Sequence, residues 1–147
     1  MSLGLLVRHG RTEANAAGIL AGRTPGLGLD PVGVAGAEAL RDRLTGAPIV
    51  AAATSPLDRT RQTAEIVLGG RLPVTIDERL IECDYGDWTG IALRRLRRRK
   101  LWSTIQERPS QVTFPGGESF AAMQERAVAA IRYLDTAVAR EHGDDAV

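Results

Sequence analysis

The most informative stretch of the chain is LLVRHGRTEAN, residues Leu5–Asn15. It begins within an apolar run, Leu3–Val7, whose length and composition are typical of a buried strand in a parallel sheet. His9 comes directly after this run, between Arg8 and Gly10. Because α/β sheets bind ligands beyond the carboxyl ends of their strands, the pattern predicts that His9 lies at a ligand-binding edge.

Apolar runs alternate with helix signals along the rest of the chain. Further strands are predicted at Ile49–Ala53 and Leu72–Ile76, and a glycine-rich loop at Ala21–Leu29. Helices are predicted over Arg11–Gly18, from the Asp30–Pro31 cap to Thr45, from the Ser55–Pro56 cap to Gly69–Gly70, over Ile91–Glu107 in two pieces, and from Ser119 to about Glu141. This alternation predicts an α/β fold, a three-layer sandwich with a largely parallel central sheet.

Length and composition narrow the classes of protein that fit. The 147 residues predict a single domain, and a net charge of +1 gives no overall signature of nucleic-acid binding. The single cysteine, Cys83, fits a reducing compartment, and no apolar run is long enough for a membrane span. We therefore expect a cytoplasmic protein. Only Lys100 among the 19 basic residues is a lysine, which is typical of a GC-rich bacterial genome.

The last residues predict that the chain is part of a longer protein. Asp144–Val147 follows a long helix and resembles the start of another strand, so the βα repeat is unfinished. We expect residues 1–147 to form a single domain whose C-terminal part is missing. A sheet edge left open in this way would favour self-association, so a homo-oligomer is expected.

Four sequence blocks resemble one family. RHGRTEAN matches the pattern R-H-G-x-T-x-x-N, the signature of the histidine phosphatase superfamily, which includes the cofactor-dependent phosphoglycerate mutases. Three further blocks are similar to family segments in the same order: SPLDRTRQTAEI at Ser55–Ile66, LIECDYGDWTG at Leu80–Gly90 and FPGGES at Phe114–Ser119. The resemblance covers nearly the whole chain.

The resemblance implies hydrolysis of a small phosphorylated substrate through a phosphohistidine on His9. It places the second phosphate-binding arginine on Arg59 and the proton-transfer carboxylate on Glu82, and it implies no metal or cofactor. The residues agree with these roles. Arg8 lowers the pKa of the neighbouring imidazole and grips phosphoryl oxygens, and Asn15 offers an amide donor to the same phosphate. Burial favours the protonated form of a carboxyl group such as Glu82, as a general acid requires.

Two alternatives for the function stay open. Transfer of the phosphoryl group to a second alcohol rather than to water would make the protein a phosphoglycerate mutase-type enzyme. A non-catalytic phosphate-binding remnant is the other alternative, because the family's second histidine, in an S-H-G motif after a strand, is not matched here. His142 follows the polar end of a helix instead, where an imidazolium is favourable.

Three other features have less specific interpretations. Asp84 is the alternative to Glu82 as the acid, and Cys83 is expected to be a packed small residue rather than a nucleophile. The basic run Arg94–Lys100 is expected to be a solvated helix face with Leu93, Leu96 and Leu101 on its buried side, although it would also suit steering of anionic substrates. Substrate specificity is expected to come from a lid over Ile91–Pro115.

Overall fold

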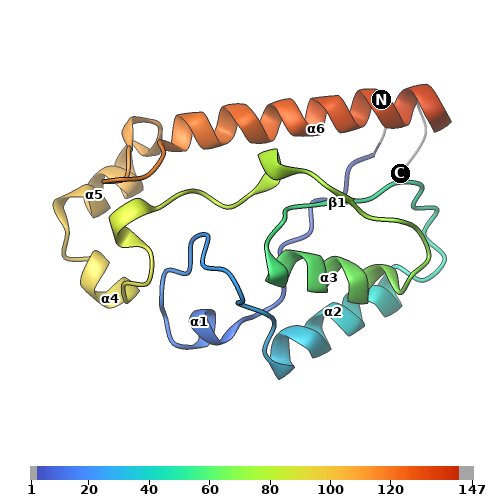
Figure 1. Cartoon of the computed structure of the whole chain (residues 1–147), viewed down its shortest axis with the longest axis horizontal. Coiled ribbons are helices and arrows are strands. Elements are labelled where there is room, and N and C mark those ends of the chain that lie inside the picture. Colours follow the sequence, from blue (N-terminus) through green and yellow to red (C-terminus); the bar gives the residue numbers. More distant parts are fainter. Residues whose placement is uncertain (1–2, 143–147) are drawn as a thin grey trace.

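A computed structural model describes residues 3–142 and shows a layered α/β arrangement. The long helix α6 lies on one side, the helices α2 and α3 lie on the other, and extended segments run between them (Figure 1). The bounds of these helices are Pro31–Arg43 for α2, Asp58–Leu68 for α3 and Phe120–His142 for α6. The middle layer contains a parallel pair of strands, and this confirms the predicted fold class.

The sheet is much smaller than the sequence predicts. The strands β1 (Ala53–Thr54) and β2 (Thr75–Ile76) pair in parallel, with Ala53 opposite Thr75 and Thr54 opposite Ile76. β1 keeps only the last residue of the predicted run Ile49–Ala53 and adds Thr54, whereas β2 keeps the last two residues of Leu72–Ile76. The other residues of these runs belong to no regular strand.

The prediction of a buried strand at Leu3–Val7 is wrong for the described residues. This segment is extended but pairs with no strand among residues 3–142, and its side chains are exposed, Leu6 to 85%. A parallel strand is buried only when neighbours pair with both of its edges and helices cover both faces. The apolar composition of the run shows that it could pack in such an environment. Whether neighbouring strands and helices are present depends on the rest of the fold.

Local signals predicted most of the ends of α2 and α3. The Asp30 side chain accepts a hydrogen bond from the Gly33 amide at 2.8 Å, so α2 begins at Pro31 as expected. α3 ends at Gly69, which has a left-handed backbone with φ of 57°. The predicted start of α3 at Ser55–Pro56 is wrong, because the Ser55 hydroxyl forms a hydrogen bond with the Thr60 hydroxyl at 2.7 Å rather than capping the helix.

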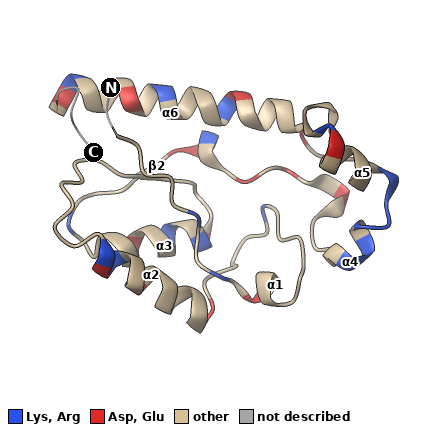
Figure 2. Ribbon diagram, turned by 180° about the vertical axis from the view of Figure 1, so that it is seen from behind, with Lys and Arg blue, Asp and Glu red and all other residues tan. Residues whose placement is uncertain are grey.

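The remaining helices are short. The bounds are Glu13–Ala16 for α1, Leu93–Leu96 for α4 and Lys100–Glu107 for α5, with 3-10 turns at Glu78–Leu80, Gly86–Trp88 and Pro109–Gln111. The two pieces predicted within Ile91–Glu107 are therefore confirmed. Leu96 is fully buried, whereas the six basic residues of Arg94–Lys100 are exposed. Figure 2 shows the basic positions of the ribbon around α4 and the start of α5. This agrees with the solvated-face interpretation.

The best-packed part of the molecule is an aromatic core around Phe114. Its ring makes edge-to-face contacts with Tyr85, Trp88 and Phe120 at centroid distances of 4.9, 5.5 and 5.1 Å. The buried residues of this core are Cys83, Trp88, Leu96, Val112 and Phe114. Such ring pairs add about 0.5–1.5 kcal/mol each beyond the burial of their area.

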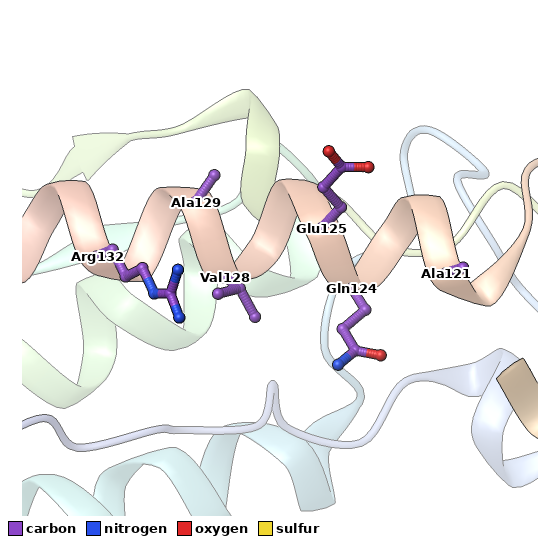
Figure 3. A pocket seen from close by; sticks show the side chains of 6 residues that line it. All are labelled: Ala121, Gln124, Glu125, Val128, Ala129 and Arg132. Carbon is purple, nitrogen blue, oxygen red and sulfur yellow. The ribbon is translucent and has the colours of Figure 1, made fainter.

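α6 is less buried than its apolar spacing predicts. Its first turn is capped by Ser119, whose hydroxyl accepts from the Ala122 amide at 3.1 Å. Ala130 is buried, but Ile131 is 42% exposed. An open hollow of about 400 Å³ lies along the helix, and Figure 3 shows Gln124, Val128 and Arg132 among the side chains that line it.

Two further observations concern the ends and the surroundings of the chain. No helix within residues 3–142 is long and apolar enough to cross a membrane. The strand predicted to begin at Asp144–Val147 lies outside the described residues.

Candidate active site

The loop that carries His9 is held against both α2 and α3. The Gly10 amide donates to the Thr63 hydroxyl of α3 at 3.0 Å, and that hydroxyl donates to the Arg59 carbonyl oxygen at 2.7 Å. A Cβ atom on Gly10 would lie 2.6 Å from the Gly33 carbonyl oxygen in the first turn of α2. Glycine is therefore required at position 10, because two backbones meet there.

The His9 ring is oriented by the backbone. Its Nδ1 atom lies 2.7 Å from the Gly10 carbonyl oxygen. A carbonyl oxygen only accepts, so Nδ1 carries the proton and a neutral ring has its lone pair on Nε2. Burial lowers the pKa of His9, and the positive charges of Arg59 and Arg8 lower it further, against the opposing effects of the Gly10 hydrogen bond and Glu82. The neutral, nucleophilic form is thus favoured.

Arg59 is a buried cation with an unused donor. Its side chain projects from the first turn of α3, and the residue is only 2% exposed. Nη2 donates to the Gly22 carbonyl oxygen at 2.9 Å, whereas the buried Nη1 finds no acceptor among residues 3–142. Burial lowers the pKa of this guanidinium, and the carboxylate of Glu82 opposes that effect. A buried, unpaired donor of this kind is typical of a ligand contact.

Glu82 is the third charged residue of this cluster. Its Oε1 atom accepts from the Cys83 amide at 2.7 Å and from the Tyr85 hydroxyl at 3.3 Å. The Glu82 charge acts on both His9 and Arg59, which it could not do from a distant part of the surface. The structure therefore brings together the three residues that the sequence assigns to nucleophile, phosphate binding and proton transfer.

Arg8 and Asn15 occupy less enclosed positions. Arg8 is exposed, yet close enough for its charge to lower the pKa of His9. The carboxamide oxygen of Asn15 accepts from the amide and the hydroxyl of Thr12, each at 3.0 Å, in a capping box at the start of α1. This local role uses the oxygen of Asn15, so only its amide nitrogen is available to a phosphate.

The alternative residues are placed as follows. Asp84 accepts from the Gly86 amide at 2.9 Å and lies 3.6 Å from Arg23, so it is engaged in the turn that follows Glu82. Cys83 is fully buried, and burial raises its pKa to about 12. A thiol with that pKa is a poor nucleophile, in agreement with its predicted packing role. His142 lies in the last described turn of α6, as expected.

Sequence reasoning missed several residues that hold the site together. Thr63 and Gly33 position the His9 loop. Arg23 and Arg126 donate to the Glu82 carbonyl oxygen, and Glu118 accepts from the Asp84 amide. The signal for Gly33 was available, because a glycine inside a helix costs about 1 kcal/mol and usually has a packing reason. The other contacts join residues far apart in sequence.

The described surface offers little beyond this cluster. Within residues 3–142, no group of three or more His, Cys, Asp or Glu side chains is arranged to hold a metal ion. A second hollow, about 430 Å³, lies between Ala17–Ile19 and Ala92–Arg97. Neither this hollow nor the one on α6 is lined by a predicted site residue.

Comparisons with known proteins agree with the motif assignment. An 84-residue stretch is 44% identical to the adenosylcobalamin/alpha-ribazole phosphatase of Salmonella typhimurium (strain LT2), covering 56% of this chain and 41% of that protein. A 132-residue stretch is 35% identical to phosphoserine phosphatase 1 of Hydrogenobacter thermophilus, covering 83% of this chain and 59% of that protein. The chain thus spans about half the length of these two curated relatives.

Comparison with solved structures and with a family profile also supports the motif assignment. The crystal structure of the alpha-ribazole phosphatase from Shigella flexneri superimposes with a TM-score of 0.76 and 31% identity over 87% of this chain and 64% of that chain. The sequence profile of the histidine phosphatase superfamily (branch 1) matches residues 5–147. With its four motif blocks and its clustered His9, Arg59 and Glu82, the chain belongs to the histidine phosphatase superfamily.

Proposed function

We propose that this protein hydrolyses a small phosphomonoester through a phosphohistidine formed on His9. One observation carries the proposal: the buried, unpaired Nη1 of Arg59 lies in the same cluster as a histidine whose Nε2 bears the lone pair. A phosphate dianion satisfies both groups, because it supplies an acceptor for the guanidinium and an electrophilic phosphorus for the imidazole. Charge-assisted hydrogen bonds of this kind contribute about 1.5–3 kcal/mol each.

The first step transfers the phosphoryl group to the enzyme. The Nε2 lone pair of His9 attacks phosphorus in line, and the bond from phosphorus to the leaving oxygen breaks as the N–P bond forms. Protonated Glu82 gives its proton to that oxygen, so the product leaves as an alcohol. Arg8 and Arg59 stabilise the charge spread over the equatorial oxygens.

The second step returns the enzyme to its starting state. The Glu82 carboxylate takes a proton from water while the water oxygen attacks phosphorus, and the N–P bond breaks to release inorganic phosphate. The electron pair of the N–P bond returns to Nε2 as its lone pair, and the proton is again on Glu82. The backbone hydrogen bond at Nδ1 stabilises the histidine in both steps, because the ring becomes a cation when phosphorylated.

The relatives include phosphatases and a 2,3-bisphosphoglycerate-dependent phosphoglycerate mutase, so both reactions are represented among them. Those described above are named for alpha-ribazole and phosphoserine phosphatase activities. The GDWTG form of the Glu82 block is also similar to that of phosphatase-type family members. We therefore infer water rather than a second alcohol as the phosphoryl acceptor.

A phosphate-release screen tests this function. The protein is incubated with a panel of alkyl and aryl phosphomonoesters, and His9→Ala is compared with Arg43→Gln, an exposed change at the end of α2. We expect turnover by the wild type and by Arg43→Gln, and a loss of more than a hundredfold in His9→Ala. Phosphate binding with no turnover of any ester would instead support the non-catalytic alternative. Transfer to an added alcohol without net hydrolysis would support the mutase.

A further inference from the structure

Three charged side chains from distant segments converge on the backbone at Glu82. Arg126 comes from α6, Glu118 from the loop that precedes it, and Arg23 from the glycine-rich loop. The two arginines contact Glu82 itself, and Glu118 contacts the Asp84 amide two residues further on. The Arg126 guanidinium donates to three backbone carbonyl oxygens, those of Arg79 at 2.7 Å, Ile81 at 2.6 Å and Glu82 at 3.1 Å. The Nε atom of Arg23 donates to the same Glu82 oxygen at 2.8 Å.

Glu118 joins the two arginines. One of its carboxylate oxygens accepts from Arg23 Nη2 and from the Asp84 amide, each at 2.9 Å, and both of its oxygens accept from Arg126. The hydrogen bond from Arg126 lowers the pKa of Glu118, against the opposing effect of burial, so the carboxylate is ionised at neutral pH. The Glu118 and Arg126 side chains are only 18% and 20% exposed, so solvent screens this pair less than a surface pair.

The Glu82 carboxyl group depends on this support. Its own hydrogen bonds come from the next residue, Cys83, and from Tyr85 three residues on. Neither bond connects it to the half of the site that contains His9. Its position relative to the phosphoryl group is therefore set by the backbone, and the backbone is what the two arginines hold.

We propose that Arg23, Glu118 and Arg126 form a positioning clamp, which fixes the Glu82 backbone so that its carboxyl group meets the leaving oxygen. The proposal rests on the proposed function, because it concerns the acid of that reaction. A misplacement of a catalytic group by about 1 Å can cost about a hundredfold in rate. The clamp also accounts for the FPGGES block, whose glutamate is Glu118 and to which no role was assigned above.

The chain offers a matched control for the clamp. Arg71 also donates to three backbone carbonyl oxygens, those of Leu68 at 3.0 Å, Leu44 at 3.1 Å and Val67 at 3.3 Å. These bonds join the ends of α2 and α3 and touch no residue of the candidate site. Arg71→Met and Arg126→Met therefore remove the same number of backbone contacts. Only Arg126→Met removes them from the segment that ends at Glu82.

The kinetic test compares leaving groups. Turnover of an alkyl phosphate, which needs a proton from the acid, is measured beside that of an aryl phosphate, which needs it less. We expect Arg126→Met to lower the alkyl rate at least tenfold more than the aryl rate, with the affinity for inorganic phosphate unchanged within about twofold. Glu118→Gln should act in the same direction, and Arg71→Met should leave the ratio of rates unchanged. An unchanged ratio in both clamp variants would overturn the proposal.

A second measurement does not depend on activity. Hydrogen exchange at the Cys83 and Asp84 amides is compared in the wild type, Arg126→Met and Arg71→Met, each corrected for its global stability. We expect exchange at least tenfold faster in Arg126→Met alone, because its clamp no longer holds the segment. Equal exchange in the three proteins would overturn the clamp. Absence of turnover in the wild type would instead overturn the proposed function, and the exchange rates would then decide the clamp alone.

Discussion

The two halves of the candidate site are supported in different ways. His9 follows the exposed segment Leu3–Val7, and its position comes from backbone contacts of Gly10 with α2 and α3. Glu82 instead lies beside the buried aromatic core around Phe114 and within a network of charged side chains. An apolar run thus supports a site only where other elements pack on it. Nothing packs in this way on Leu3–Val7 within the described residues, so His9 depends on the contacts of Gly10.

The largest expected effect tests this difference in packing. Phe114→Ala should reduce the free energy of unfolding by about 3–5 kcal/mol, because it removes a ring with three aromatic neighbours and leaves a cavity. Leu6→Ala, at an 85% exposed position, should stay within about 0.5 kcal/mol of the wild type. Denaturant unfolding measures both variants. A large loss of unfolding free energy in Leu6→Ala would show that Leu3–Val7 is packed in solution. The two halves of the site would then not differ in packing.

The next effect distinguishes the chemistry of the two halves. Glu82→Gln should lower turnover of alkyl phosphates by about a hundredfold or more, because an amide cannot supply the proton for the leaving oxygen. Aryl phosphates should suffer less, and binding of inorganic phosphate to the His9 half should be preserved. Steady-state kinetics with both classes of substrate, together with calorimetry for phosphate, provide the measurement. If both classes fall equally, Asp84 becomes the candidate acid.

The smallest effect concerns the charge on His9. Its pKa in the folded protein lies below the ordinary value of 6.5, so the unfolded chain takes up the proton first as the pH falls. The contribution of His9 to stability is therefore complete above pH 6.5 and is lost as the pH falls toward the folded pKa. Arg8→Gln removes a nearby positive charge and should raise the His9 pKa. An NMR titration of the ring follows this midpoint, and a midpoint that moves down would contradict the electrostatic account.

Features set by neighbouring residues were predictable from the sequence. Asp30 with Pro31 begins α2, and Gly69 ends α3, because caps depend on a few adjacent positions. The Ser55–Pro56 cap failed for a reason of the same kind, since a hydroxyl five residues away competes for Ser55. The capping box of Asn15 is also local, but the prediction for Asn15 was a contact with phosphate, which follows from the family motif.

Features that join distant residues were not predictable. Pairing of Leu3–Val7 depends on strands elsewhere, so composition alone misjudged its burial. The motif blocks located His9, Arg59 and Glu82 individually, and the structure shows that their charges interact. Contacts such as Arg126 with Glu82 span 44 residues and leave no periodic pattern in the sequence.

Trapping the phosphorylated enzyme tests the central claim most directly. The protein is mixed with the phosphomonoester that it turns over fastest, quenched in alkali, and digested for peptide mass spectrometry. We predict a phosphoryl group on His9 that is labile in acid and absent from His9→Ala. A phosphoryl group on Ser55, Cys83 or His142, or one that persists in His9→Ala, would contradict the assignment of His9 as the nucleophile.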